Sequence, residues 1–324
     1  MASLLSRGSG AKGPSPARLL KVPSVKLPRL PFPYSAPTVP EGVEAPERRR
    51  RSGPTYDSDW ARRLPARLGR AALRETVIRS AVKALAAPEL HGLDRLEALR
   101  ADGDPVIFAA NHHSHLDTPV LLTTVPDPWQ DRLFVVAAAD YFFRNAVTSA
   151  LSALVINAMP FERTRINRRS GDRAAALIDD GWSMLIFPEG GRSPDGWGQP
   201  FRGGAAYLAL RCDVPVVPIH IEGTSRILRK GKTLPTPSTV KVTFGPPLRP
   251  GEGDDARRFG AKIETAVAEL ADEATTDWWS ARRRAHAGTT PGLTGPEAAS
   301  WRRAWALGDA SRRTRRTKRR WPDI

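Results

Sequence analysis

Short apolar runs alternate with stretches of helical spacing from about residue 89 to residue 276 of this 324-residue chain. Strands that alternate with helices form βαβ units, in which a mostly parallel sheet is covered on both faces. The sequence therefore predicts an α/β fold with a mostly parallel central sheet flanked by helices. The expected strands span 106–110, 133–139, 153–161, 182–188, 214–221 and 239–244, and the expected helices span 117–125, 141–151, 171–181, 203–211 and 254–276.

The two ends of the chain differ in composition from this middle part. Residues 1–56 are rich in Pro, Ser and basic residues, and Pro at this frequency excludes helices and central strands, so a disordered basic arm is expected. Residues 57–277 are expected to form one domain, which begins with a helical stretch interrupted near Pro65. Residues 278–324 are rich in Arg and Trp, and a C-terminal extension with a disordered basic tail is expected there.

The chain is strongly basic, with a formal net charge of +16. Such a surface associates with polyanions, and both nucleic acid and anionic lipid headgroups fit this charge. The single cysteine, Cys212, excludes an internal disulfide framework and a Cys-rich zinc site, which fits a reducing compartment. No apolar run reaches the roughly 18 residues of a membrane-spanning helix, and the first residues lack the apolar core of a secretory signal.

The segment NHHSHLD, residues 111–117, holds three of the six histidines of the chain and directly follows an expected strand. His112 and Asp117 meet only if the chain turns between them, because five residues of continuous helix would separate the two side chains by about 140°. A carboxylate that holds one ring nitrogen of a histidine leaves the other nitrogen free to accept a proton from a hydroxyl. A metal site and a plain polar loop are the alternatives, although the spacing matches no common zinc motif.

Two further polar sets follow later expected strands. FERTR, residues 161–165, offers two arginines beside an acid, and FPEGGRS, residues 187–193, offers an acid, two glycines and an arginine. Arginine binds phosphate bidentately, and glycine lets the backbone approach a ligand closely. Each set alone is typical of a surface turn or a solvated charge cluster. Three polar sets at strand ends indicate one shared site, because sites in open α/β sheets form where strands end.

These segments resemble the ordered blocks of the glycerolipid acyltransferase family, of the 1-acylglycerol-3-phosphate acyltransferase type. The first block, N-H-x4-D, is matched by Asn111, His112 and Asp117. The third block, F-P-E-G-T-R-S, is matched by 187–193 with Gly191 in place of Thr. The second and fourth blocks are matched by Pro160–Arg163, with Asn157 where the family has Gly, and by 214–221. The resemblance covers roughly residues 75–250.

The resemblance implies a glycerol-3-phosphate (1)-acyltransferase-like fold and an acyl transfer step of phospholipid biosynthesis. The acyl group would move from an acyl thioester, acyl-CoA or acyl carrier protein, to a free hydroxyl of lysophosphatidic acid or a related glycerophospholipid. His112 would be the general base, oriented by Asp117, and no metal or cofactor other than the acyl donor is expected. Five residues are expected to bind the acceptor's phosphate end: Arg163, Glu189, Gly190, Arg192 and Ser193. Because a carboxylate repels phosphate, Glu189 is expected to hold the loop or an acceptor hydroxyl.

A lysophospholipid acceptor lies in a bilayer, so peripheral binding to anionic phospholipid on the cytoplasmic side of the cell membrane is expected. Trp beside Arg suits the bilayer interface, although tryptophans can also pack on the catalytic domain. Three segments are candidates for this contact: the helical region 140–152, the basic stretch 60–86, and the C-terminal segment with Trp278, Trp279, Trp301 and Trp305.

Two other functions are compatible with parts of the pattern. A non-catalytic lipid-binding protein would share the fold, but the intact pair of His112 and Asp117 favours an enzyme. A nucleic-acid-binding protein would gather its basic residues in a folded groove with stacking aromatic side chains, whereas here they gather at the two ends of the chain. The sequence therefore favours an acyltransferase without a nucleic-acid partner, and it leaves the donor, the acyl chain length and the acceptor open.

Overall fold

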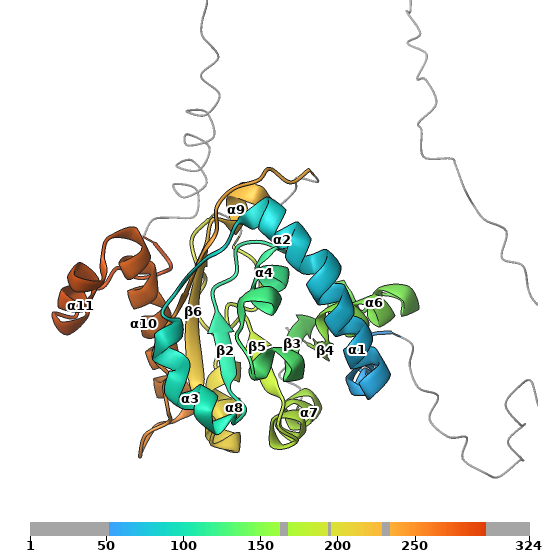
Figure 1. Ribbon diagram of the computed structural model, residues 1–324. Coiled ribbons are helices and arrows are strands. Elements are labelled where there is room, and N and C mark those ends of the chain that lie inside the picture. Colours follow the sequence, from blue (N-terminus) through green and yellow to red (C-terminus); the bar gives the residue numbers. More distant parts are fainter. Residues whose placement is uncertain (1–51, 163–167, 194–195, 229–233, 296–324) are drawn as a thin grey trace, which may run out of the picture. The chain divides into compact units, whose positions relative to one another are not determined.

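A seven-stranded sheet in the order β1-β7-β6-β2-β5-β3-β4 forms the centre of the computed structural model, which describes residues 52–162, 168–193, 196–228 and 234–295 (Figure 1). All neighbouring strands are parallel except β6 and β7. The predicted α/β class with a mostly parallel sheet is therefore confirmed. The strands are β1 (Glu89–His91), β2 (Ile107–Ala110), β3 (Leu133–Ala138), β4 (Ala158–Phe161), β5 (Ser183–Ile186), β6 (Val216–Glu222) and β7 (Lys241–Phe244).

Helices cover both faces of the sheet, and the chain enters through one long helical stretch that runs from α1 through a π-helical turn into α2 (Figure 1). Pro65 lies in the first turn of α1, where its missing N–H costs nothing, so the interruption predicted there is the start of this helix. The helices are α1 (Leu64–Leu73), α2 (Arg79–Ala86), α3 (Glu97–Asp102), α4 (Asp117–Thr124), α5 (Ala139–Phe142), α6 (Ala146–Ile156), α7 (Arg168–Asp179), α8 (Gly204–Cys212), α9 (Thr224–Ile227), α10 (Ala256–Thr275) and α11 (Trp278–His286).

Strand β2 separates two hydrophobic cores. Its four residues are fully buried, and they alternate between the two faces of the sheet. Phe108 and Ala110 join the core beneath α2 and α4, whereas Ile107 and Ala109 join the core beneath α7, α8 and α10. A strand that is buried on both faces has apolar residues at every position. The continuous apolar run at 106–110 therefore predicts this strand correctly.

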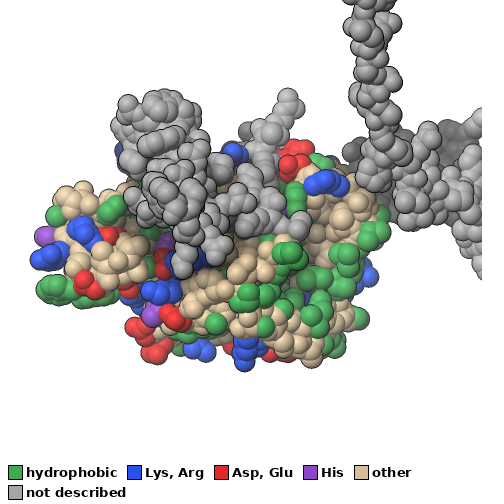
Figure 2. Space-filling view, turned by 90° about the horizontal axis from the view of Figure 1, so that it is seen from above, with side chains coloured by type: hydrophobic (Ala, Val, Ile, Leu, Met, Phe, Trp, Pro, Cys, Tyr) green, Lys and Arg blue, Asp and Glu red, His purple; other side chains and the backbone are tan. Residues whose placement is uncertain are grey.

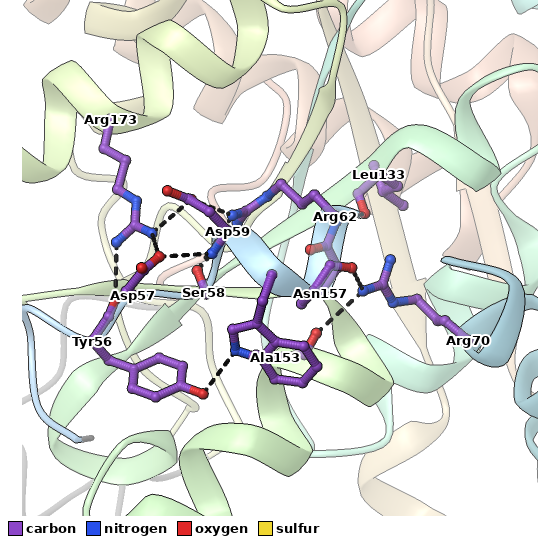
Figure 3. Close-up of polar contacts among 12 residues, drawn as sticks. Tyr56, Asp57, Ser58, Asp59, Arg62, Arg70, Leu133, Ala153, Asn157 and Arg173 are labelled. Atoms are coloured by element: carbon purple, nitrogen blue, oxygen red, sulfur yellow. Dashed lines mark hydrogen bonds and ion pairs between the residues drawn. The ribbon is translucent and has the colours of Figure 1, made fainter. Parts of the chain in front are cut away.

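The expected strand 153–161 is wrong in its first half. Helix α6 continues to Ile156, and Asn157 ends it in the left-handed conformation with φ at 49°. Asparagine and glycine adopt this conformation most readily, so Asn can replace the Gly of the second block here. The buried Asn157 amide also donates to the Leu133 carbonyl oxygen at 2.9 Å (Figure 3). Short apolar runs do not distinguish a helix end from a strand, which explains the error.

Residues 52–56 belong to the folded part of the chain, although the sequence places them in the basic arm. The Gly53 N–H donates to the Phe143 carbonyl oxygen at 2.7 Å, and Tyr56 is buried against the Phe143 ring. Arg173 of α7 donates to the Tyr56 carbonyl oxygen at 2.9 Å (Figure 3). The folded part therefore begins before residue 57. Burial of the Tyr56 ring stabilises these residues in the fold, although their composition resembles that of the basic arm.

The C-terminal extension predicted from residue 278 begins as part of the same packed structure. Helix α11 lies along α10, and the Arg284 guanidinium donates to both carboxylate oxygens of Asp272 at 2.7 Å. Farther along, the Leu293 carbonyl oxygen accepts the Gly198 N–H at 2.9 Å. Within the described ranges, no helix is both long enough and apolar enough to cross a bilayer. Predictions for residues 1–51, for Trp301 and Trp305, and for the basic tail fall outside the described residues.

Candidate active site

The carboxyl ends of β2 and β5 bring two of the predicted polar segments together. These strands are parallel neighbours, so residues 111–117 after β2 and residues 187–193 after β5 emerge at the same edge of the sheet. A direct contact joins them, since the Ser193 N–H donates to the His112 carbonyl oxygen at 3.0 Å. The FERTR segment follows β4, two strands farther along, and its Arg163 lies outside the described residues.

The predicted contact between His112 and Asp117 is present. The His112 Nδ1 lies 2.9 Å from the Asp117 Oδ2, and the Asp117 side chain is fully buried. The chain turns between them as expected, because Asp117 is the first residue of α4 while His112 lies in the preceding loop. The same carboxylate oxygen accepts the backbone N–H groups of His113 at 2.7 Å and Ser114 at 2.8 Å. Asp117 therefore fixes both the turn and one nitrogen of the His112 ring.

Phe187 supports the other side of the His112 ring. The two rings are stacked, with centroids 4.1 Å apart and an angle of 22° between their planes. The His112 side chain is 16% exposed, so the imidazole lies near the surface while its partner carboxylate does not. With Nδ1 held by Asp117 and the ring plane held by Phe187, Nε2 is the nitrogen left to exchange a proton with a bound substrate.

Glu189 joins the loop after β5 to the loop after β2. One carboxylate oxygen accepts the His112 N–H at 2.8 Å, and the other accepts the Gln199 N–H at 2.9 Å. The side chain is only 1% exposed, and burial raises its pKa from the ordinary 4.5 to about 7, although the two N–H groups oppose this shift. The expectation that Glu189 holds the loop agrees with these contacts.

The glycine and serine of the same loop have conformational roles. Gly190 adopts a φ of 70°, and a Cβ atom there would lie 2.8 Å from the Arg202 guanidinium, so both backbone and space favour glycine. The Ser193 hydroxyl accepts the Gly196 N–H at 2.7 Å. The guanidinium of Arg192 forms no hydrogen bond or ion pair with any described residue, whereas its carbonyl oxygen accepts from the Gln199 amide at 3.2 Å. Arg192 is therefore a cation at this edge that can bind an anionic group.

Asn111 ties the end of β2 to the fourth block. Its side-chain amide donates to the Ile221 carbonyl oxygen at 2.9 Å and its side-chain oxygen accepts the Ile221 N–H at 2.8 Å. Residues 216–222 form β6, and the Pro218 carbonyl oxygen accepts the Gly245 N–H at 2.8 Å. The fourth block is thus a core strand that positions Asn111, and through it the start of the His112 loop.

The other two histidines of NHHSHLD have different surroundings. His113 contributes its backbone N–H to Asp117, and burial lowers the pKa of its ring. The His115 ring stacks on Tyr141 at a centroid distance of 4.9 Å and meets Phe142 edge-on. Within the described ranges, no group of three or more His, Cys, Asp or Glu side chains is arranged to hold a metal ion.

Phe187 and Gln199 are site residues whose roles the sequence did not reveal. The contact of Gln199 with Glu189 crosses ten positions, and no local pattern announces it. Phe187 belongs to a recognised block, but its stacking on His112 depends on two neighbouring strands that are far apart in sequence. Both residues hold groups of the site in place.

The chain has relatives of known family. Residues 87–222 match the family model described as Acyltransferase. Residues 87–222 therefore form a domain that is similar to the acyltransferases of this family. A chloroplastic 1-acyl-sn-glycerol-3-phosphate acyltransferase of Brassica napus is 32% identical over 136 residues, which cover 42% of this chain and 38% of that protein. The human 1-acyl-sn-glycerol-3-phosphate acyltransferase alpha is 25% identical over 183 residues, which cover 53% of this chain and 61% of that protein.

A solved structure shares the fold of the acyltransferase domain. The crystal structure of PlsC, the 1-acyl-sn-glycerophosphate acyltransferase of Thermotoga maritima, superposes with a TM-score of 0.53 and 23% identity. The match covers 68% of this chain and 84% of that chain. The chain spans less than two thirds of the length of the two sequence relatives, and the likeness to the solved structure shows the fold.

Glu189 gives the acyltransferase domain a testable dependence of stability on pH. The folded protein keeps the Glu189 proton at pH values where the unfolded chain has lost it, because the pKa is raised from 4.5 to about 7. The contribution to stability is therefore complete below pH 4.5 and is lost as the pH rises to about 7. We expect the fall in unfolding free energy from pH 5 to pH 8 to be roughly 1–3 kcal/mol larger in wild type than in Glu189→Gln.

Urea unfolding at both pH values measures this difference, and Glu189→Gln is the matched control because its amide does not titrate. Equal pH dependence in the two proteins, or the opposite sign, would contradict a buried carboxyl at this position. Glu189→Ala leaves the His112 and Gln199 N–H groups without their acceptor. That variant should lose about 2–5 kcal/mol of unfolding free energy at pH 5.

Proposed function

We propose that this protein transfers a fatty acyl group from an acyl thioester to a free hydroxyl of lysophosphatidic acid or a related glycerophospholipid. The observation that carries the proposal is the His112–Asp117 pair, with its 2.9 Å contact and its fully buried carboxylate. The names of the relatives agree, since the Brassica napus and human proteins are both 1-acyl-sn-glycerol-3-phosphate acyltransferases.

In the proposed reaction, the acceptor brings its own nucleophile. The His112 Nε2 accepts the proton of the acceptor hydroxyl as the oxygen attacks the thioester carbonyl carbon. Asp117 stabilises the imidazolium that forms, because its buried carboxylate already contacts Nδ1. When the carbon–sulfur bond breaks, the imidazolium returns the proton to the leaving thiolate. The products are an ester and a free thiol, and His112 ends in its starting state without a covalent intermediate on the protein.

The proposed acceptor site lies along residues 187–193. The Arg192 guanidinium has no anionic partner among the described residues, so it is suited to the acceptor's phosphate. Glu189 uses both carboxylate oxygens for backbone N–H groups, so its proposed part in binding is to shape the loop. Arg163 belongs to the proposed set through its place in the second block. Gly190 and Ser193 would contribute through the backbone, since their side-chain positions are filled or already bonded.

The proposed reaction consumes the acyl donor and requires no cofactor, because the chemistry is proton transfer and acyl exchange. Either acyl-CoA or an acyl carrier protein supplies the activated thioester. An acceptor that resides in a membrane places the protein at an anionic phospholipid surface, and the net charge of +16 favours that association. We place it as a peripheral protein on the cytoplasmic side of the cell membrane.

A direct assay tests the proposal. Purified protein is incubated with acyl-CoA or acylated carrier protein and a panel of lysolipids, while free thiol release and product mass are followed. Acceptor-dependent thiol release together with a diacyl product is expected. Thioester breakdown without a new lipid ester, or no breakdown with any acceptor, would exclude acyl transfer.

A further inference from the structure

Helix α6 has an unusual distribution of side chains for a surface helix. Its eleven residues, AVTSALSALVI, include no charged side chain. The fully buried positions are Ser149 and Ala153, whereas Val147 is 68% exposed and Leu151 is 54% exposed. A helix that covers a core normally buries its large apolar residues and exposes charged ones. Ile156 at the end of α6 packs against the core in this way, but the first two turns expose Val147 and Leu151 and carry no charge, which suits contact with something other than water.

The inner face of α6 is held by polar contacts, which keeps the apolar face turned outward. The Arg70 guanidinium donates to the Ala153 carbonyl oxygen (Figure 3). It also donates to the Leu154 carbonyl oxygen at 2.8 Å. A capping box between Asn145 and Thr148 fixes the start of the helix. These contacts leave little freedom for α6 to rotate and bury Val147.

A groove lies beside this face. It has a volume of about 340 Å³, and the side chains that line it are Tyr141, Phe142 and Leu151 together with the polar Arg144, Asn145, Thr148 and Ser152. Tyr141 is 40% exposed and stacks on His115 of the NHHSHLD segment. The exposed face of α6 is therefore connected through aromatic rings to the loop that carries His112.

We infer that the exposed surface of Tyr141, Val147 and Leu151, named here the α6 surface, is where this protein contacts a lipid bilayer. The inference rests on the proposed function, because an enzyme whose acceptor is a lipid must contact the bilayer in which that lipid lies. Two observations favour that occupant. Arg144 lies 5.1 Å from the centroid of the Tyr141 ring, the pairing of cation and aromatic that suits headgroup level. The chain as a whole carries a net charge of +16, which complements anionic lipid.

The arrangement of the molecule agrees with a contact on this side. In Figure 2, hydrophobic side chains gather on the right, the side on which Figure 1 places α1 and α6. A second exposed pair, Trp278 and Trp279, lies on α11. That helix packs on α10, which contacts β6 and β7, whereas α6 leads into β4 at the opposite edge of the sheet. The tryptophan pair and the exposed face of α6 therefore lie toward opposite edges of the sheet, which lets substitutions test them separately.

The double variant Val147→Glu, Leu151→Glu tests the inference, and Trp278→Glu, Trp279→Glu is its matched control. Glutamate at residue 147 lies in the first turn of α6, where a negative charge favours the helix, so the fold should persist. In flotation with vesicles of phosphatidylcholine and phosphatidylglycerol, the α6 variant should bind about tenfold or more weakly than wild type. The α11 variant should stay within about twofold of wild type.

Three results would overturn the inference. These are unchanged vesicle binding by the α6 variant, a loss confined to the α11 variant, and a wild-type dimer in sedimentation that the α6 variant abolishes. Circular dichroism and thermal melting identify a variant that has lost its fold, and Val147→Ser, Leu151→Ser then takes its place. Acyl transfer to a short-chain acceptor dissolved as monomers separates this inference from the proposed function. The α6 variant should retain that transfer, whereas a wild type that binds vesicles but transfers nothing contradicts the proposed function alone.

Discussion

The substitution His112→Ala is expected to lower acyl transfer by ~10²–10⁴-fold, the usual contribution of a positioned general base. The imidazole is the group whose Nδ1 is held by Asp117 and whose face is held by Phe187, so its removal leaves no described proton acceptor in that position. The backbone N–H of residue 112, which donates to Glu189, remains in the variant. The loop should therefore keep its shape, and the loss should appear in kcat. Steady-state rates of thiol release measure it.

His113→Ala is the matched control for this loss. Its contact with Asp117 comes from the backbone N–H, which alanine retains, so transfer should fall by less than about tenfold. Thermal melting of both variants must show folded protein. A folded His112→Ala protein that transfers at the wild-type rate would contradict the general-base role. An equal loss of activity in both variants would mean that the substitutions disturb the loop and do not remove a base.

Contacts between residues that are close in the sequence are the part of this structure that the sequence predicts best. The His112–Asp117 contact joins residues five positions apart at a strand-to-helix junction, so the spacing alone constrained it. The strands that are buried on both faces, such as β2, were predicted because they are continuous apolar runs. Strand β1 was missed because its three residues are all exposed and form no such run.

The remaining site contacts depend on pairs that only the folded sheet brings together. Glu189 meets the His112 N–H across 77 positions, and Asn111 meets Ile221 across 110 positions. The sequence indicated that polar segments gather at one edge, but it did not specify which oxygen accepts which N–H. The sequence named the region 140–152 as one of three candidates for bilayer contact, but it did not show that Val147 and Leu151 are exposed while Ser149 and Ala153 are buried.

The substitution Asp117→Asn is expected to lower kcat by ~10²–10³-fold while leaving the fold in place, the loss typical for one preorganised electrostatic group. The Asp117 Oδ2 accepts three N–H groups, so the carboxamide must turn its carbonyl oxygen toward them. Its NH₂ group then takes the place of the buried Oδ1, which has no hydrogen-bond partner among the described residues. The geometry and the tautomer of His112 should survive, and the one feature removed is the negative charge that we propose stabilises the imidazolium.

This separation makes Asp117→Asn more informative than Asp117→Ala. The asparagine variant should lose about 1–3 kcal/mol of unfolding free energy for one buried unpaired donor, with KM for the acceptor little changed. Asp117→Ala leaves the buried N–H groups of His113 and Ser114 without an acceptor, so it should lose more stability. Kinetics and urea unfolding on both variants measure the two effects independently. If Asp117→Asn keeps the wild-type kcat, the buried charge does not assist proton transfer, and Asp117 acts only by holding the loop.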